Sequence, residues 1–296
     1  MASQTNRINY SVLPWYTAQK FQNALTQQRL GYGNGVPYCL PAEQYHLPPF
    51  QIVRTTDISD PIIEFKLINY ESGQEYDILA AITAAGLVVE NYTTYDIIMC
   101  PGTSAMTGLV IPLGIYWAKI RTNALTWYSD VFEWFTEAAI EKMVKVSFWH
   151  DARFALPIGH ISYVEPFYNY IYFPTQINKP RFENDNIYEK NDGYQFPIYM
   201  ISQVKFHFFW IVPEYLAHVI RIIEHHHYKT IEFDEVLYDP IFFEADIAEE
   251  SEDQGHVWRV NFFFELDTVV TTTGKIKVED EGNEYDQSEY DNSEFD

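Results

Sequence analysis

Five residues around the end of one predicted helix carry side chains that can bind a metal ion. They are His218, Glu224 and the three histidines 225–227. A metal site needs lone pairs that converge on one point and a second shell of contacts that fixes each imidazole. Three consecutive histidines instead fan out around a helix end, where they interact favourably with the last carbonyl groups. The sequence therefore predicts no metal site and no other cofactor.

Carboxylate pairs are the other candidate for chemistry, because the chain has 42 Asp and Glu residues. Glycoside hydrolysis uses two carboxyl groups at a set separation in space, and the sequence singles out no such pair. Motifs for a nucleophile elbow, a phosphate-binding loop and a zincin helix are absent. We predict no catalytic residue and no enzyme activity. A glycoside-active enzyme is kept as the third functional alternative, since aromatic residues make up 17% of the chain and stack on sugars.

Charge and composition argue against several classes of binding partner. With 19 Lys and Arg residues and a net charge of -23, the chain is poorly suited to bind nucleic acid by neutralising phosphates. The two cysteines, Cys39 and Cys100, cannot make a disulfide framework. No apolar run is long enough to span a membrane and the N-terminus lacks an apolar signal region, so we expect no membrane partner and no secretion.

An acidic stretch, residues 244–253, lies between two predicted strands. One interpretation is a solvated hairpin loop. The other is a negatively charged wall of a ring or channel, past which duplex DNA slides without adhering. The candidate channel-facing residues are Asp246, Glu249, Glu250, Glu252 and Asp253.

The C-terminal residues 279–296 form a second acidic segment, with nine acids and no base. Such a tail cannot bury enough apolar surface to fold alone. Its repeat places Tyr285, Tyr290 and Phe295 five residues apart, which gives no continuous stripe on a helix. We expect an extended tail whose aromatic rings dock on another chain, with a purely solvating tail as the alternative.

The elements that would position these segments are mainly strands. Residues 1–50 are predicted to be an N-terminal arm, 51–136 an immunoglobulin-like β-sandwich, and 137–278 a second β-sandwich or barrel with one packed helix at about 213–225. Residues 114–120 and 125–134 are predicted to pair as a hairpin. In the strand 258–266, Phe262 and Phe264 should face the core and Arg259 and Asn261 the other side. The helix should bury Leu216, Ile220 and Ile223.

Three segments carry a resemblance to a known class of protein. They are Tyr38–Gln44 leading to Pro48–Ile52, the hairpin Pro112–Phe132 and the helix start Val212–Ala217. Together, over residues 38–270, they resemble virion structural proteins of tailed phages of Bacteroidota, including the crAss-like group. The resemblance implies a non-enzymatic tail, neck or baseplate protein that assembles in rings, and it supplies no catalytic residues.

The sequence thus predicts a mainly β, two-domain structural protein of the virion, assembled in the host cytoplasm. Its partners would be copies of itself, held in a homo-oligomeric ring by exchanged arms, and other virion proteins. Genome DNA would pass through the ring without sequence-specific binding. The competing alternative is a carbohydrate- or receptor-binding β-sandwich module with exposed aromatic rings as stacking platforms.

Overall fold

Strands account for most of the chain in the computed structural model, so the prediction of a mainly β protein is confirmed. The structure describes residues 11–17, 39–55, 60–91, 95–100, 106–149, 168–179, 181–191, 194–224, 226, 228–250, 257–266 and 269–272. The chain divides into two compact units. Met1–Arg181 with Val204–Asp267 form the first, and Phe182–Gln203 with Thr268–Asp296 form the second.

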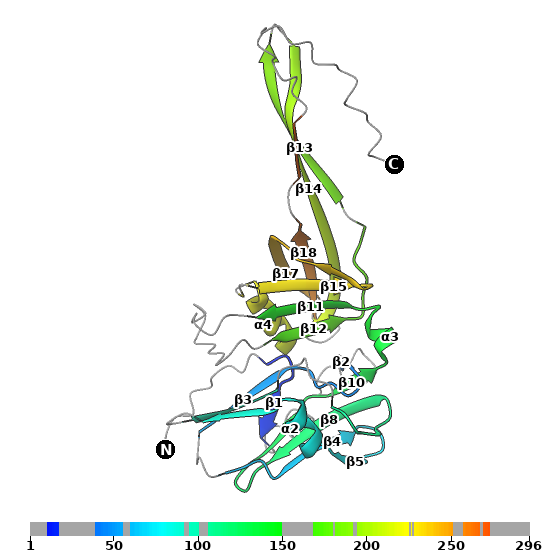
Figure 1. The fold of residues 1–296 in the computed structure, drawn as a ribbon, viewed down its shortest axis with the longest axis vertical. Coiled ribbons are helices and arrows are strands. Elements are labelled where there is room, and N and C mark those ends of the chain that lie inside the picture. Colours follow the sequence, from blue (N-terminus) through cyan, green and yellow to red (C-terminus); the bar gives the residue numbers. More distant parts are fainter. Residues whose placement is uncertain are drawn as a thin grey trace, which may run out of the picture. The chain divides into compact units, whose positions relative to one another are not determined.

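The first half of the chain contributes two sheets to the first unit (Figure 1). The larger sheet has the strand order β1-β9-β8-β10-β2, and β4 pairs with both β8 and β5. Its strands are β1 (Trp15–Thr17), β2 (Leu40–Glu43), β4 (Glu64–Asn69), β5 (Glu75–Asp77), β8 (Gly114–Arg121), β9 (Thr126–Ser129) and β10 (Phe132–Phe135). The smaller sheet has the order β3-β7-β6, made of β3 (Phe50–Thr55), β6 (Val88–Asn91) and β7 (Tyr95–Cys100).

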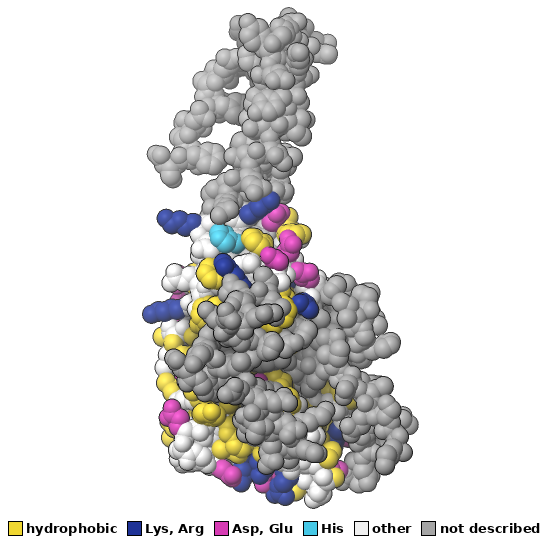
Figure 2. Space-filling model, turned by 180° about the vertical axis from the view of Figure 1, so that it is seen from behind, with side chains coloured by type: hydrophobic (Ala, Val, Ile, Leu, Met, Phe, Trp, Pro, Cys, Tyr) yellow, Lys and Arg dark blue, Asp and Glu magenta, His cyan; other side chains and the backbone are white. Residues whose placement is uncertain are grey.

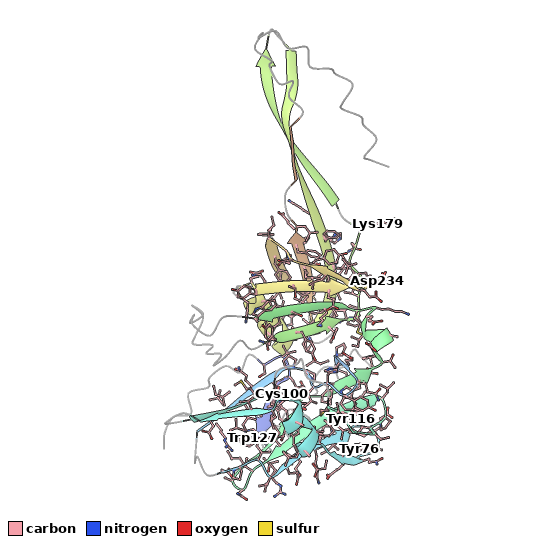
Figure 3. The ribbon with its side chains drawn as sticks, viewed as in Figure 1. Tyr76, Cys100, Tyr116, Trp127, Lys179 and Asp234 are labelled. Atoms are coloured by element: carbon pink, nitrogen blue, oxygen red, sulfur yellow. The ribbon has the colours of Figure 1, made fainter. Side chains whose placement is uncertain are left out.

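Aromatic side chains join these two sheets face to face. The rings of Trp15 and Phe50 lie 4.8 Å apart, and Phe50 meets Phe65 of the larger sheet at 6.3 Å. Elsewhere in the larger sheet Tyr76 and Tyr116 meet edge to face at 6.2 Å (Figure 3). Edge-to-face pairs of this kind add to the stability gained from apolar burial.

The described residues of the predicted N-terminal arm belong to this core. β1 pairs with β9, and β2 runs parallel to β10. Val12, Leu13, Leu40 and Leu47 are each at most 2% exposed. These apolar residues are separated by prolines and polar residues, so they show no helical or strand period, yet tertiary packing buries them.

The predicted hairpin is confirmed where β8 pairs with β9, but its second strand is broken. The segment 125–134 forms β9 and β10 with Asp130 and Val131 between them, because the Asp130 N–H donates to the Pro14 carbonyl at 2.9 Å.

A short helix, α2 (Leu79–Ala85), follows β5 and ends at Gly86, whose φ of 114° suits a residue without a Cβ.

The second half of the first unit is a sheet-on-sheet sandwich. Its four-stranded sheet has the order β12-β11-β15-β16, made of β11 (Val144–Trp149), β12 (Asn169–Phe173), β15 (Tyr228–Phe233) and β16 (Val236–Tyr238). The facing sheet pairs residues 205–213 of β14 (Tyr194–Pro213) with β18 (Val257–Glu265), which also pairs with β17 (Phe242–Glu250). The ring of Phe173 lies 4.9 Å from that of Phe262 and 5.9 Å from that of Phe208.

The predicted orientation of the strand 258–266 is confirmed. Phe262 and Phe264 are 0% exposed, whereas Arg259 and Asn261 point to the other face of the same strand and are partly exposed. The predicted helix is also confirmed as α4 (Glu214–Ile223), with Leu216, Ile220 and Ile223 buried. A four-residue helix, α3 (Glu137–Ile140), precedes β11.

The predicted boundary at residues 136 and 137 does not separate two units, because one apolar core runs through both sandwiches. The hydroxyl of Tyr170 in β12 also donates to the carbonyl of Leu47, at 3.4 Å. The second unit instead contains β13 (Arg181–Asn191) from residue 182, the part of β14 before Val204, and β19 (Val269–Thr272), which pairs with Tyr199–Ser202.

No helix in the described part of the chain has the length and apolar character that crossing a membrane requires.

Candidate interaction surface

The outward face of β14, β18 and β17 is the strongest candidate site. Along each strand, buried residues alternate with residues that point away from the core. We name the outward set the aromatic–ionic face. It comprises Lys205, His207, Phe209, Ile211, Arg259, Asn261, Phe263, Glu265, Phe242, Glu244 and Asp246. Figure 2 shows one face of the molecule on which a histidine lies among hydrophobic, acidic and basic side chains.

Three phenylalanines cross this face diagonally. Phe209 opposes Asn261, so it is the diagonal neighbour of Phe263, and Phe263 opposes Glu244, so it is the diagonal neighbour of Phe242. Diagonal neighbours in an antiparallel sheet are about 7–8 Å apart, within reach of aromatic rings. Their exposed fractions are 45%, 42% and 46% for Phe209, Phe263 and Phe242. The result is an exposed apolar stripe on a rigid sheet.

Ring contacts and one hydrogen bond hold side chains around this stripe. The guanidinium carbon of Arg259 lies 4.6 Å from the centre of the Phe209 ring, and its Nε donates to Asn261 Oδ1 at 3.2 Å. The His207 ring stacks on Phe263 with the ring centres 6.3 Å apart. A partner that binds such held side chains loses less conformational entropy than one that must order them.

The acidic stretch meets this face in a way that corrects the sequence interpretation. Residues 244–250 lie in β17 and not in a loop, because β17 pairs with β18 from Phe242 through to Glu250. Asp246 and Glu244 are exposed on the aromatic–ionic face. For Glu249 and Glu250 the structure describes the strand only, and Glu252, Asp253, Tyr285, Tyr290 and Phe295 lie outside the described residues. Whether the acids face a channel stays a prediction.

Charge on β17 has a structural consequence, because β17 is the outermost described strand on its side of the sheet. Exposed carboxylates on an edge strand oppose unwanted pairing with another chain. The carboxylate of Glu224, just past α4, accepts the Ala245 N–H of β17 at 2.6 Å and so covers part of this edge.

The helix α4 ends at Ile223, before the histidine run, as predicted. His226 is 1% exposed, and its ring meets that of Phe148 edge to face with centres 4.9 Å apart. The backbone N–H of His226 donates to the Ile223 carbonyl. Lys229 Nζ donates to the carbonyls of Glu224 and His226, so a cation satisfies the helix C-terminus. His225 and His227 are outside the description. In the described ranges no three His, Cys, Asp or Glu side chains gather as a metal site would require.

A shallow hollow beside α2 is lined mostly by small and apolar residues, among them Ala80, Ala84 and Leu109. The one carboxylate in its lining is Asp77, whose Oδ1 accepts the Leu79 N–H at 3.0 Å. This hollow therefore offers little to orient a polar ligand.

The two cysteine thiols lie in surroundings that oppose ionisation. Burial raises the pKa of Cys39 to about 12, with further contributions from the charges of Glu133 and Asp130. Burial alone raises the pKa of Cys100 to about 12. Because the thiolate is the nucleophile, neither side chain is prepared for nucleophilic chemistry at neutral pH.

We therefore expect both thiols of the native chain to react slowly with a maleimide at pH 8 and quickly after unfolding in guanidinium chloride. The reason is the raised pKa, which leaves almost no thiolate at that pH, together with the burial of Cys100 and the partial burial of Cys39. Mass spectrometry of the labelled chain measures the reaction. Fast labelling of either cysteine before unfolding would show an accessible, ionised thiol and contradict this account.

The sequence predicts Arg259 and Asn261 on the face of the strand opposite the core, where the structure has them, but it does not predict the phenylalanine stripe. One signal was present: Phe262, Phe263 and Phe264 are consecutive in a strand. Since neighbouring side chains of a strand point to opposite faces, Phe263 had to point away from the core.

Comparison with protein-family models, with curated proteins and with solved structures finds no match to this chain.

Proposed function

We propose that the protein is a non-enzymatic structural protein that assembles with copies of itself. The observation that carries this proposal is the exposed stripe of Phe209, Phe263 and Phe242, with Arg259 packed against its first ring. The cores of protein interfaces are enriched in aromatic residues and arginine, and these residues supply much of the binding energy. A rigid sheet presents them here already ordered.

The finer parts of the proposal rest on the sequence. The resemblance of residues 38–270 supports a place in a ring of the tail, neck or baseplate of a phage virion. The net charge of -23 suits a ring that DNA passes through without adhering. The contact of Trp15 in the larger sheet with Phe50 in the smaller sheet supports an immunoglobulin-like arrangement of the first sandwich. The acidic tail with Tyr285, Tyr290 and Phe295 supplies a docking segment for other virion proteins.

Replacing Phe209 and Phe263 together by serine should weaken self-association at least about tenfold, which corresponds to about 1.4 kcal/mol. Both rings are exposed, so the melting temperature should change little. Sedimentation velocity over a concentration series measures the association. Leu237→Ser is the matched control, because Leu237 is 65% exposed on β16, away from the stripe. Equal association of the double variant and the wild type would contradict a role for this face.

A carbohydrate-binding module is the second candidate, and the same face supports it. Sugars stack on exposed rings and exchange hydrogen bonds with flanking polar groups, here Asn261 and the accepting carboxylates of Glu244 and Asp246. A glycan array probed with the chain separates the candidates. Binding to a defined glycan that is lost in the Phe209→Ser/Phe263→Ser variant, by a chain that stays monomeric, would favour the module over assembly.

A further inference from the structure

The segment Ser11–Thr17 bonds to both sheets of the first sandwich, and we call the site that it occupies there the slot. At its start, Ser11 Oγ donates to the Gln51 carbonyl at 2.9 Å and accepts the Gln51 N–H at 2.6 Å, and the Leu13 N–H donates to the Pro49 carbonyl at 3.2 Å. Further on, β1 pairs antiparallel with β9. One short segment thus bonds to the smaller sheet first and to the larger sheet next.

Apolar anchors hold the segment in this slot. Val12 is 1% exposed, Leu13 0% and Trp15 8%. The Trp15 ring contacts Phe50 of the smaller sheet at 4.8 Å and Phe65 of the larger sheet edge to face at 6.0 Å. A three-residue strand is held weakly by backbone pairing alone, so these three side chains supply most of its attachment.

The length of chain between β1 and Cys39 allows the segment to come from the same chain or from a neighbouring copy. The partners of the segment are remote in sequence, at residues 49–51 and 127–130. Residues 18–38 separate β1 from Cys39, and 21 residues reach up to about 70 Å when extended. β1 is also the outermost described strand of its sheet on that side. An edge strand on a long connection is the arrangement in which identical elements exchange between copies.

We propose that, in the assembly, the segment Ser11–Thr17 of one copy fills this slot in a neighbouring copy. The proposal rests on the proposed function, because exchange requires self-association. The proposal identifies residues 11–17 as the part of the predicted N-terminal arm that binds the neighbouring copy. Trp15 and Leu13 would make the same contacts within one chain or between two chains. Exchange therefore costs none of the contacts described above while it links each copy to the next.

Two single-cysteine additions test the exchange. Tyr16 and Tyr128 are directly opposite each other in the pairing of β1 with β9. Facing residues of an antiparallel pair have Cα atoms about 4.5–5.5 Å apart, which suits a disulfide. Chains carrying Tyr16→Cys and differently tagged chains carrying Tyr128→Cys are co-expressed, and the assembled fraction is oxidised and separated without reductant. We expect a covalent dimer that carries both tags.

Three controls make each outcome decisive. The double variant Tyr16→Cys/Tyr128→Cys in one chain verifies that this pair forms a disulfide. Tyr16→Cys co-expressed with Leu237→Cys should give no dimer above the wild-type background, since Leu237 lies on β16. An assembled fraction without the two-tag dimer, or one in which the Leu237→Cys mixture crosslinks equally well, would overturn the exchange and leave the assembly function intact. A chain that never assembles would overturn both.

Discussion

Phe262→Ala should lower the free energy of unfolding of the first unit by about 3–5 kcal/mol, the usual range for removing a fully buried aromatic side chain. Phe262 is 0% exposed, and its ring stacks on Phe208 with centres 4.5 Å apart. It also meets Phe173 of the facing sheet at 4.9 Å and Phe243 at 5.9 Å. The substitution leaves a cavity at the junction of the two sheets, and the surrounding rings cannot collapse into it fully.

The neighbouring residue is the matched control for this prediction. Phe263 lies on the same strand but is 42% exposed on the opposite face. Phe263→Ala should therefore shift the urea midpoint far less, although it removes the same atoms. Unfolding is followed by tryptophan fluorescence. Equal midpoints for Phe262→Ala and Phe263→Ala would show that the alternation of β18 does not decide which ring stabilises the fold.

Asp96→Ala should lower the free energy of unfolding by about 3–5 kcal/mol, because it leaves a buried arginine without its closest carboxylate. Asp96 is 0% and Arg54 6% exposed. The Nε and Nη2 atoms of Arg54 both donate to Asp96 Oδ2, at 3.2 and 3.0 Å. Asp60 lies further away, 3.9 Å from Nη1 of Arg54, and accepts the N–H groups of Asn123 and Ala124.

Two further variants test whether burial is the cause. Replacing both partners, with Arg54→Met and Asp96→Leu, should restore much of the lost stability, because neither charge of this buried pair is then left without the other. The pair Lys66–Glu75 is shorter, at 2.6 Å, but solvent-exposed. Glu75→Ala should barely move the urea midpoint, since water screens such a pair. A larger effect of Glu75→Ala than of Asp96→Ala would contradict this ranking.

How much of the fold the sequence predicts depends on whether an element carries a regular period. The strand 257–265 has a clear period of two and the helix 214–223 a clear helical period. The sequence predicts both elements together with their buried faces. The N-terminal residues Val12, Leu13 and Leu40 lack a period, so their burial could not be derived locally. Leu13 bonds to Pro49 and Leu40 pairs with Phe132, and only the folded chain brings together these partners, which are more than thirty residues apart.

The candidate site was predictable to a smaller extent. Asp246 was placed at the surface, but a run of acids looked like a loop, because charged residues are uncommon in the interior of a sheet. β17 is the outermost described strand on its side of the sheet, and it carries Glu244 and Asp246 on its solvent-exposed face. The diagonal of Phe209, Phe263 and Phe242 depends on the register of three strands. A one-residue slip would move every ring to the other face, so no single segment reveals it.

Self-association of the full chain is the central claim, and native mass spectrometry at micromolar concentration tests it most directly. Each chain has a mass of 34.8 kDa. The account predicts one discrete species at a whole multiple of that mass, depleted in the Phe209→Ser/Phe263→Ser variant. A wild-type chain that stays at 34.8 kDa at every concentration and ionic strength would contradict it.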